Sequence, residues 1–140
     1  METKQEIFEH FNTSPAFHLS TVEDGKPHVR GMLLFKADER GVIFHTGKFK
    51  DVFRQIQANP NVEICFFFSK NGTQYRMSGE LVLDEDKALF EEIYNHPTRK
   101  FMRDWGEKLT DQIAVYRMPH GKITSWNMAA NFDAKQYVEF

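Results

Sequence analysis

Residues 28–60 read HVRGMLLFKADERGVIFHTGKFKDVFRQIQANP, and this pattern predicts two strands followed by a short helix. A turn at 38–41 separates an apolar run at 32–35 from a second run at 42–46, as in a β-hairpin. After Gly47, apolar side chains recur at the i, i+3, i+4 and i+7 spacing of one helix face, namely Phe49, Val52, Phe53 and Ile56. Asn59 and Pro60 end that helix.

The same stretch holds cations where an anion can be bound. Arg30 lies in an apolar strand, and Lys48 and Lys50 lie where the helix begins. Fixed cations together with the free N–H groups of a helix N-terminus form a phosphate site. Arg30 has two interpretations, an ion pair with Glu63 or Glu80 on a neighbouring strand, or a two-pronged grip on a phosphate. Gly31 favours the second, because a glycine in a strand lets a ligand approach the backbone.

The rest of the chain predicts more antiparallel strands with helices between them. Thr3 and Glu6 form a capping box for a first helix, and Asp84 is expected to cap a third. A further short helical segment leads to Gly106, and a turn at 119–122 predicts a hairpin. Seven strands are expected at 16–22, 27–36, 42–46, 62–69, 74–83, 113–118 and 123–127, and residues 137–140 are a candidate for a short additional edge strand. We expect a mainly β fold, a small six- to seven-stranded antiparallel barrel with inserted helices, formed by one domain at 1–140.

Composition narrows the class of protein. The 18 basic and 20 acidic residues nearly balance, and no long basic tract favours nucleic-acid binding. No run has the ~20 apolar residues of a membrane helix. The single Cys65 excludes an intramolecular disulfide, so we expect a cytoplasmic protein with no membrane partner. Cys65 lies in the apolar run at 62–69, which predicts a strand buried on both faces and a core thiol. Because Phe66, Phe67 and Phe68 cannot all face one core, either helices or another subunit are expected to cover the second face.

Several kinds of catalytic site are absent from the sequence. It contains no glycine-rich phosphate loop, no nucleophile elbow and no HExxH helix. Its six histidines are scattered without metal-ligand spacing, so we expect no metal site. No side chain is assigned as a catalytic acid, base or nucleophile.

Three segments resemble the pyridoxamine 5'-phosphate oxidase-like FMN-binding split barrels. They are TVEDGKPHVRGMLLF at 21–35, GVIFHTGKFKDVFRQIQANPNVEICFF at 41–67 and QYRMSGEL at 74–81. The likeness runs from about Phe17 to Leu83 and continues more weakly to the end. The sequence ends without the Arg-x-His pair of true pyridoxamine phosphate oxidases, and is more similar to the small general-stress and nitroimidazole-reductase-like members.

This resemblance implies an FMN site shared by two subunits of a homodimer. It implies that Arg30 and Lys50 hold the flavin phosphate, with Gly47 and Lys48 in the same loop. It also implies that Gly31, Met32 and Leu33 run beside the flavin ring and that His45 and Thr46 lie next to the ring and ribityl chain. Gln74 and Trp126 are expected to reach the site from the other subunit. Arg40 and Arg54 have no role in the family and are interpreted as surface residues.

The resemblance implies a flavin-dependent oxidoreductase acting on a small molecule. NAD(P)H is the expected electron donor, and the substrate is not identified by the sequence. The alternative is a protein that holds flavin or haem without turnover. Haem needs an axial ligand, for which His18, His28 and His120 are the candidates. A deazaflavin is a third possible cofactor, but the chain has no extended basic groove for its acidic tail.

Overall fold

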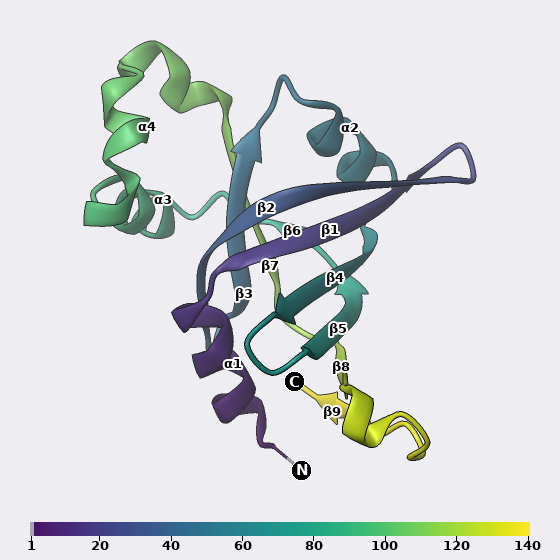
Figure 1. The fold of residues 1–140 in the computed structure, drawn as a ribbon. Coiled ribbons are helices and arrows are strands. Elements are labelled where there is room, and N and C mark those ends of the chain that lie inside the picture. The colour runs from purple at the N-terminus through teal and green to yellow at the C-terminus, as the bar shows by residue number, and fades with distance from the viewer. Residues whose placement is uncertain (1) are drawn as a thin grey trace.

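The computed structural model describes residues 2–140, which form one curled antiparallel sheet with helices at its edges (Figure 1). The strands are β1 Ala16–Glu23, β2 Lys26–Asp38, β3 Gly41–Gly47, β4 Asn61–Phe68, β5 Thr73–Glu80, β6 Val82–Leu83, β7 Ile113–Met118, β8 Lys122–Trp126 and β9 Val138–Glu139. The helices are α1 Lys4–Thr13, α2 Asp51–Ala58, α3 Lys87–Tyr94 and α4 Lys100–Asp104, with 3-10 turns η1 Pro97–Arg99, η2 Glu107–Gln112 and η3 Met128–Ala130.

The strand order is β6-β7-β3-β2-β1-β4-β5-β8-β9, and every pairing is antiparallel. The prediction of a mainly β, antiparallel fold with inserted helices is therefore confirmed. The predicted number of six to seven strands is too low, because the described residues form nine. The run expected at 74–83 is two strands: β5 ends at Glu80, and β6 pairs with β7 instead.

The hairpin predicted at 119–122 is wrong. Strand β7 pairs with β3 and β6, whereas β8 pairs with β5 and β9, so the turn carries the chain from one end of the sheet to the other. Gly121 and Phe140 exchange backbone hydrogen bonds there. A turn sequence specifies a change of direction, but it does not specify the partner of the strand that follows.

The helix starts depend on side-chain caps. Thr3 accepts a hydrogen bond from the Glu6 N–H at 3.2 Å, which confirms the predicted start of α1. The cap of α3 is Asp86, which accepts from the Ala88 N–H, so the assignment of this role to Asp84 is wrong. The Asp84 carboxylate instead accepts from Arg117 at 2.7 Å.

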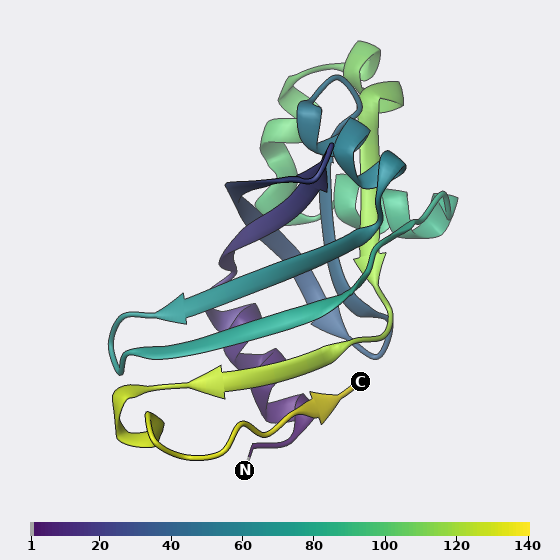
Figure 2. The ribbon, with the colours of Figure 1, turned by 90° about the vertical axis from the view of Figure 1, so that its right-hand side faces the viewer.

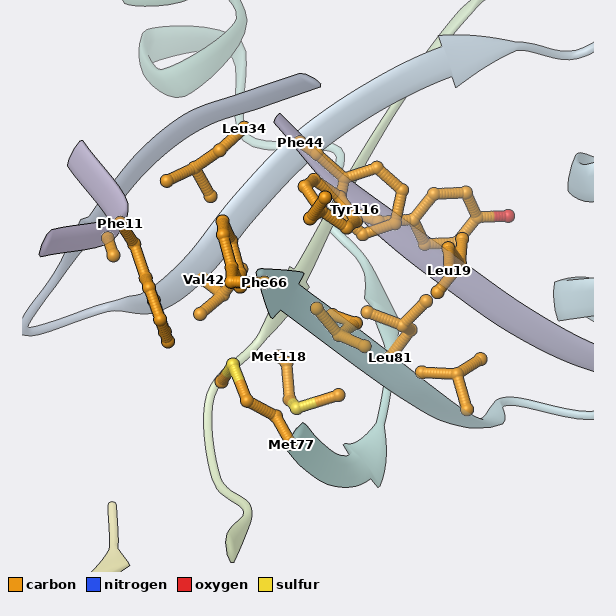
Figure 3. Close-up of a cluster of buried hydrophobic side chains, with 14 of the residues drawn as sticks. Phe11, Leu19, Leu34, Val42, Phe44, Phe66, Met77, Leu81, Tyr116 and Met118 are labelled. Carbon is orange, nitrogen blue, oxygen red and sulfur yellow. The ribbon is translucent and has the colours of Figure 1, made fainter. Parts of the chain in front are cut away.

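The core lies inside the curl of the sheet and is closed by α1 (Figure 3). Phe11 of α1 stacks on Phe66 of β4 with ring centroids 3.8 Å apart and planes 7° apart. Phe17 and Phe44 meet edge to face, and both are fully buried. Five phenylalanines are buried in this core, namely Phe8, Phe11, Phe17, Phe44 and Phe66.

The outer face of β4 is not covered within the chain. Phe67 is 58% exposed, while its neighbour Phe66 is fully buried. No helix of the described residues covers this face, so the expectation of a helical cover is wrong, while that of a cover by another subunit stays a prediction. Cys65 is half-buried on the outer face and is not a core thiol. The strand alternates as expected for a sheet that has one face free. In Figure 2, β4, β5 and β8 lie side by side across this face.

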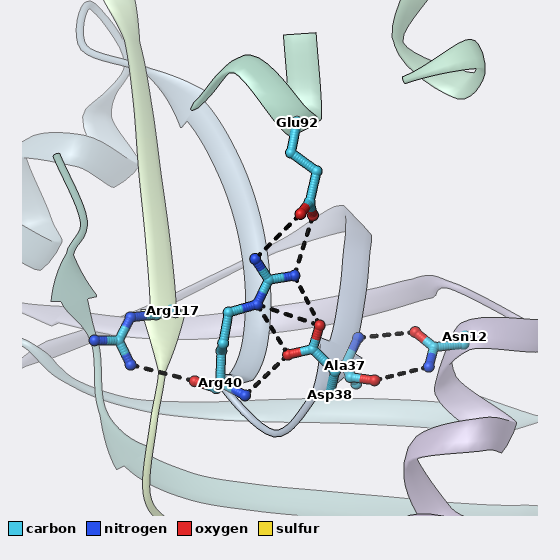
Figure 4. Close-up of polar contacts among 6 residues, drawn as sticks. All are labelled: Asn12, Ala37, Asp38, Arg40, Glu92 and Arg117. Atoms are coloured by element: carbon cyan, nitrogen blue, oxygen red, sulfur yellow. Dashed lines mark hydrogen bonds and ion pairs between the residues drawn. The ribbon is translucent and has the colours of Figure 1, made fainter. Parts of the chain in front are cut away.

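Arg40 ties the helical insertion to the sheet (Figure 4). Its guanidinium donates to Asp38 at 2.7 Å and to Glu92 of α3 at 3.0 Å. Arg117 also donates to the Arg40 carbonyl. Arg40 is thus a partly exposed surface residue, as interpreted from the sequence, and it also links the sheet to α3. Arg54 is 59% exposed and pairs with Glu23.

The Phe11–Phe66 stack generates a stability prediction. Phe66→Ala is expected to lower the free energy of unfolding by about 3–5 kcal/mol, because it removes a buried ring and leaves a cavity. Phe132→Ala is the control, because Phe132 is 97% exposed and its change should stay within ~0.5 kcal/mol. Urea unfolding followed by circular dichroism measures both, and equal losses in the two variants would contradict the described core.

Candidate functional site

The candidate site lies where β2 and β3 separate. The first pair, Asp38 with Gly41, adjoins the turn, and the last pair is Leu34 with Phe44. A bulge between Leu34 and Lys36 precedes this last pair, and the pairing stops there. Beyond this point β2 continues with β1 alone, and the end of β3 continues with β7 alone. The sheet therefore opens into a gap between 30–33 of β2 and 45–47 of β3.

This gap exposes the backbone edge of β2. The Leu34 N–H donates to the Pro15 carbonyl, on the β1 side. Polar backbone groups point to alternate sides along an antiparallel strand. The N–H and C=O groups of Gly31 and Leu33 therefore point away from β1, into the gap. Unpaired strand groups of this kind bind other polar groups, and here they are available to a ligand.

A pocket of about 290 Å³ fills the gap. It joins seven of the residues predicted to bind a cofactor, which are Gly31, Met32, Leu33, His45, Thr46, Gly47 and Lys50. The remaining wall is contributed by Phe49, Phe101, Trp105, Leu109, Gln112 and Ile113. The pocket is slightly smaller than the ~300–1,000 Å³ usual for small-molecule sites. Phe49 and Trp105 at its rim are 71% and 52% exposed, so the site is open to solvent.

Gly31 keeps one side of the pocket clear. A Cβ built on it would meet no protein atom within 4 Å. No neighbour within the described residues therefore requires a glycine at this position. A side chain here would project into the open space of the pocket, and the role predicted for Gly31 stays a prediction.

Arg30 lies beside α2, outside the pocket lining. Its guanidinium donates to the Thr21 hydroxyl at 2.8 Å and to the Gln55 amide oxygen at 2.6 Å. The ion pair considered for Arg30 is absent within residues 2–140, where Glu63 pairs with Arg76 instead. The Nε–H of Arg30 makes no hydrogen bond to the described residues, and Nη2 donates only to Gln55, so the Nε–H and one Nη2 N–H are left for a ligand.

The two lysines differ in position. Lys50 is the N-cap residue of α2 and lines the pocket, so it is placed beside the positive end of the helix. The Lys48 N–H donates to the Gln112 carbonyl, which fixes the loop, but its side chain does not line the pocket. Asp51 at the helix start pairs with Arg54 at 3.0 Å. The Arg54 charge partly neutralises the Asp51 carboxylate, so this carboxylate repels an anion bound here less strongly.

Arg99 is a residue that the sequence did not single out. It is 3% exposed, and no carboxylate of the described residues pairs with it. Its Nε–H donates to His45 Nε2 at 2.9 Å, and its Nη2 donates to the Leu34 carbonyl at 3.0 Å. It also lies over the Phe35 ring, with its Cζ 5.4 Å from the ring centroid. No sequence motif marks this arginine, because its partners are 54 and 65 residues away.

Burial and the neighbouring cations set the protonation state of His45. Burial, followed by the charges of Arg99 and Lys50, lowers the pKa of His45 to about 4. The ring is therefore neutral at pH 7. Since Arg99 donates to Nε2, the proton of the neutral ring is on Nδ1. His45 thus presents a neutral N–H donor at the end of β3.

Gln74 and Trp126 are not part of this pocket. They face each other across the β5–β8 ladder and line a separate groove of about 800 Å³ beneath the C-terminal segment. The three candidate haem ligands, His18, His28 and His120, line neither cavity. Within residues 2–140, no group of three or more metal-ligating side chains gathers, and no helix is long and apolar enough to cross a membrane.

Comparison with known proteins identifies relatives of the chain. A family model described as pyridoxamine 5'-phosphate oxidase matches residues 3–126. A pyridoxine/pyridoxamine 5'-phosphate oxidase of Psychrobacter cryohalolentis is 37% identical over 87 residues, which are 61% of this chain and 40% of that protein. The chain therefore spans less than half the length of this curated relative. These matches confirm the resemblance found in the sequence.

Solved structures share the fold at low identity. A NimC/NimA family protein of Clostridium acetobutylicum has a TM-score of 0.78 at 20% identity, over 97% of this chain and 91% of the other. General stress protein 26 of Bacillus anthracis has a TM-score of 0.71 at 17% identity, over 97% and 98%. A pyridoxamine 5'-phosphate oxidase-related, FMN-binding protein of Nostoc punctiforme has a TM-score of 0.70 at 15% identity, over 98% and 95%.

The lowered pKa of His45 predicts a pH dependence of stability. The unfolded ring binds a proton below about pH 6.5, and the folded ring does so only near about pH 4. The neutral, buried His45 therefore contributes fully to the free energy of unfolding above about pH 6.5. This contribution falls by about 2 kcal/mol between about pH 7 and pH 5, because the unfolded chain binds the proton first. His45→Gln should remove this slope in urea unfolding. His28→Gln, at an exposed position, should retain it. Identical slopes in both variants would contradict the buried neutral ring.

Proposed function

Because the chain belongs to the pyridoxamine 5'-phosphate oxidase family, we propose that it is an FMN-dependent oxidoreductase whose flavin site is completed by a second copy of the chain. The observation that carries this proposal is the gap between β2 and β3. It combines a free backbone edge, a glycine with open space beside it and cations at the start of α2. A flat ring with a phosphate tail requires these three features together.

Each feature corresponds to one part of FMN. The backbone groups of Gly31 and Leu33 are donors and acceptors for the edge of the ring. His45 adds a neutral N–H donor, and Thr46 adds a hydroxyl. Lys50 and the free Nε–H of Arg30 supply positive charge and a directed donor for the phosphate. Lys48 adds charge on the same loop. The residues present thus fit the cofactor.

The incomplete pocket supports the proposal of a homodimer. Exposed apolar side chains lie on the outer face of the sheet, among them Val29, Leu33, Phe67 and Trp126, which are 69%, 46%, 58% and 38% exposed. The pairings of β1 with β2, of β1 with β4, of β4 with β5 and of β5 with β8 place these residues on one face. Apolar surface of this kind on one face marks an interaction site. Under the proposal, Gln74 and Trp126 of one copy reach the pocket of the other.

The protein's own contribution is binding and orientation. FMN supplies reversible redox chemistry when it is bound, with NAD(P)H as the proposed donor. No carboxylate or thiol lines the pocket among the described residues, so no side chain is assigned as a catalytic acid or base. The alternative function, a flavin holder without turnover, has the same site. Reduction of bound FMN by NADH in a stopped-flow experiment separates the two.

Binding of FMN is the first test. We expect FMN to bind with a visible flavin spectrum and to raise the melting temperature. Arg30→Ala should weaken binding by about 10–100-fold, or about 1.4–3 kcal/mol, because a charge-assisted contact to the phosphate is lost. Lys36→Ala on the same strand is a control with an equal charge change at an exposed position. A colourless protein that FMN neither stabilises nor colours would refute the proposed function.

The oligomeric state is the second test. The wild-type protein is expected to sediment as a dimer at micromolar concentration. Phe67→Asp places a charge on the outer face of β4 without touching the core, so it should give a folded monomer with weakened FMN binding. Circular dichroism checks that the variant folds. A wild-type protein that sediments as a monomer but binds FMN tightly would show that the site does not need a second copy.

A further inference from the structure

The pocket has a second wall to which the proposed flavin site assigns no role. It consists of Phe101 of α4 and Trp105 and Leu109, which follow it, and we name these three residues the aromatic wall. Phe101 and Trp105 meet edge to face with centroids 5.3 Å apart. Phe101 also lies 6.3 Å from the ring of His45. The three side chains are 39%, 52% and 37% exposed, and they line the same pocket as one apolar patch.

The wall belongs to the helical insertion between β6 and β7, which is held firmly in place. Glu92 of α3 is bound by Arg40, and Arg99 before α4 is buried against His45 and Leu34. Met102, between Phe101 and Trp105 in sequence, is buried in the cluster beneath. The exposed aromatic residues are thus carried by a fixed support, which is the condition for a preformed binding surface.

Charged side chains of this segment are turned away from the pocket. Lys100 and Asp104 pair with each other at 3.0 Å. Arg103 donates to the backbone carbonyls of Tyr94 and His96. The charged residues of η2 do not line the pocket either, and Lys50, the one cation that does, is part of the proposed phosphate site. His45 is neutral at pH 7. The aromatic wall therefore offers no positive charge to an anionic substrate.

We propose that the aromatic wall is the substrate-binding surface of the flavin site and that it selects flat, uncharged rings over anionic ones. Aromatic faces stack on flat rings, and the gain is about 0.5–1.5 kcal/mol per pair beyond buried area. An anionic group would lose its hydration here without gaining a partner. This inference rests on the proposed function, since the ring of FMN would form the opposite side of the space.

The test uses the FMN-loaded protein and two matched probes, a naphthoquinone and its sulfonate. Isothermal titration calorimetry measures binding without turnover. The naphthoquinone should bind at least tenfold more tightly than the sulfonate. Trp105→Leu and Phe101→Leu should each weaken naphthoquinone binding by about three- to tenfold, because a stacking partner is lost. Phe132→Leu, an exposed aromatic outside both cavities, is the control and should change nothing.

Trp105→Arg provides a gain of function, because it adds a cation to the wall. It should narrow or invert the preference in favour of the sulfonate. FMN binding and sedimentation of each variant show whether the flavin site and the dimer persist. Equal affinity for the two probes with FMN bound would overturn the inference alone. A Trp105→Leu variant that loses its dimer would show that the wall is an interface and would also overturn it. Failure of the wild-type protein to bind FMN would overturn the proposed function and the inference together.

Discussion

The separation of β2 from β3 after Leu34 and Phe44 is the constraint on which the rest of this structure depends. The pairing stops although neither strand ends there: residues 30–33 of β2 continue with β1, and residues 45–47 of β3 continue with β7. A sheet that opens in this way leaves polar backbone groups without partners, which costs free energy if they are buried without water or a ligand. The pocket lies where those groups face outward. The fold and the site are thus two results of one divergence, that of β2 from β3.

The cations near this gap are held in place by neutral groups. Arg40, Arg54, Arg76 and Arg117 all pair with carboxylates. Arg30 and Arg99, which lie next to the site, instead donate to amide, hydroxyl, imidazole and carbonyl groups. Burial lowers the pKa of both guanidinium groups, which shows that their charge is poorly compensated. Cations fixed without counter-ions are suited to receive an anion from outside the chain.

The sequence predicted the local structure well, and it predicted which residues of β2, β3 and the start of α2 lie close together. Alternation, turns and caps located all the longer strands, and Gly31, His45, Thr46 and Lys50 converge on one pocket as expected. Pairings between distant strands were not predictable, because the turn at 119–122 reads as a hairpin whichever strand follows. The half-burial of Cys65 was missed for a similar reason, whereas the exposure of Phe67 agrees with a second face that no helix covers. An apolar run does not show whether its second face is covered by the same chain or by another molecule.

The missed residues show what decides the chemistry of the pocket. Arg99 and the aromatic wall lie in the insertion at 84–112, where the family resemblance is weaker and local patterns indicate only short helices. Their effects arise from contacts across long sequence separations. Burial, with the added charge of Arg99, lowers the pKa of His45, and Met102 anchors the segment that carries Phe101 and Trp105. The pocket thus combines cations at the start of α2 with an uncharged wall on the opposite side. A ligand whose phosphate meets the cations, together with a flat uncharged molecule that stacks on the aromatic wall, satisfies both sides. A second anionic molecule at the wall would find no cation to pair with.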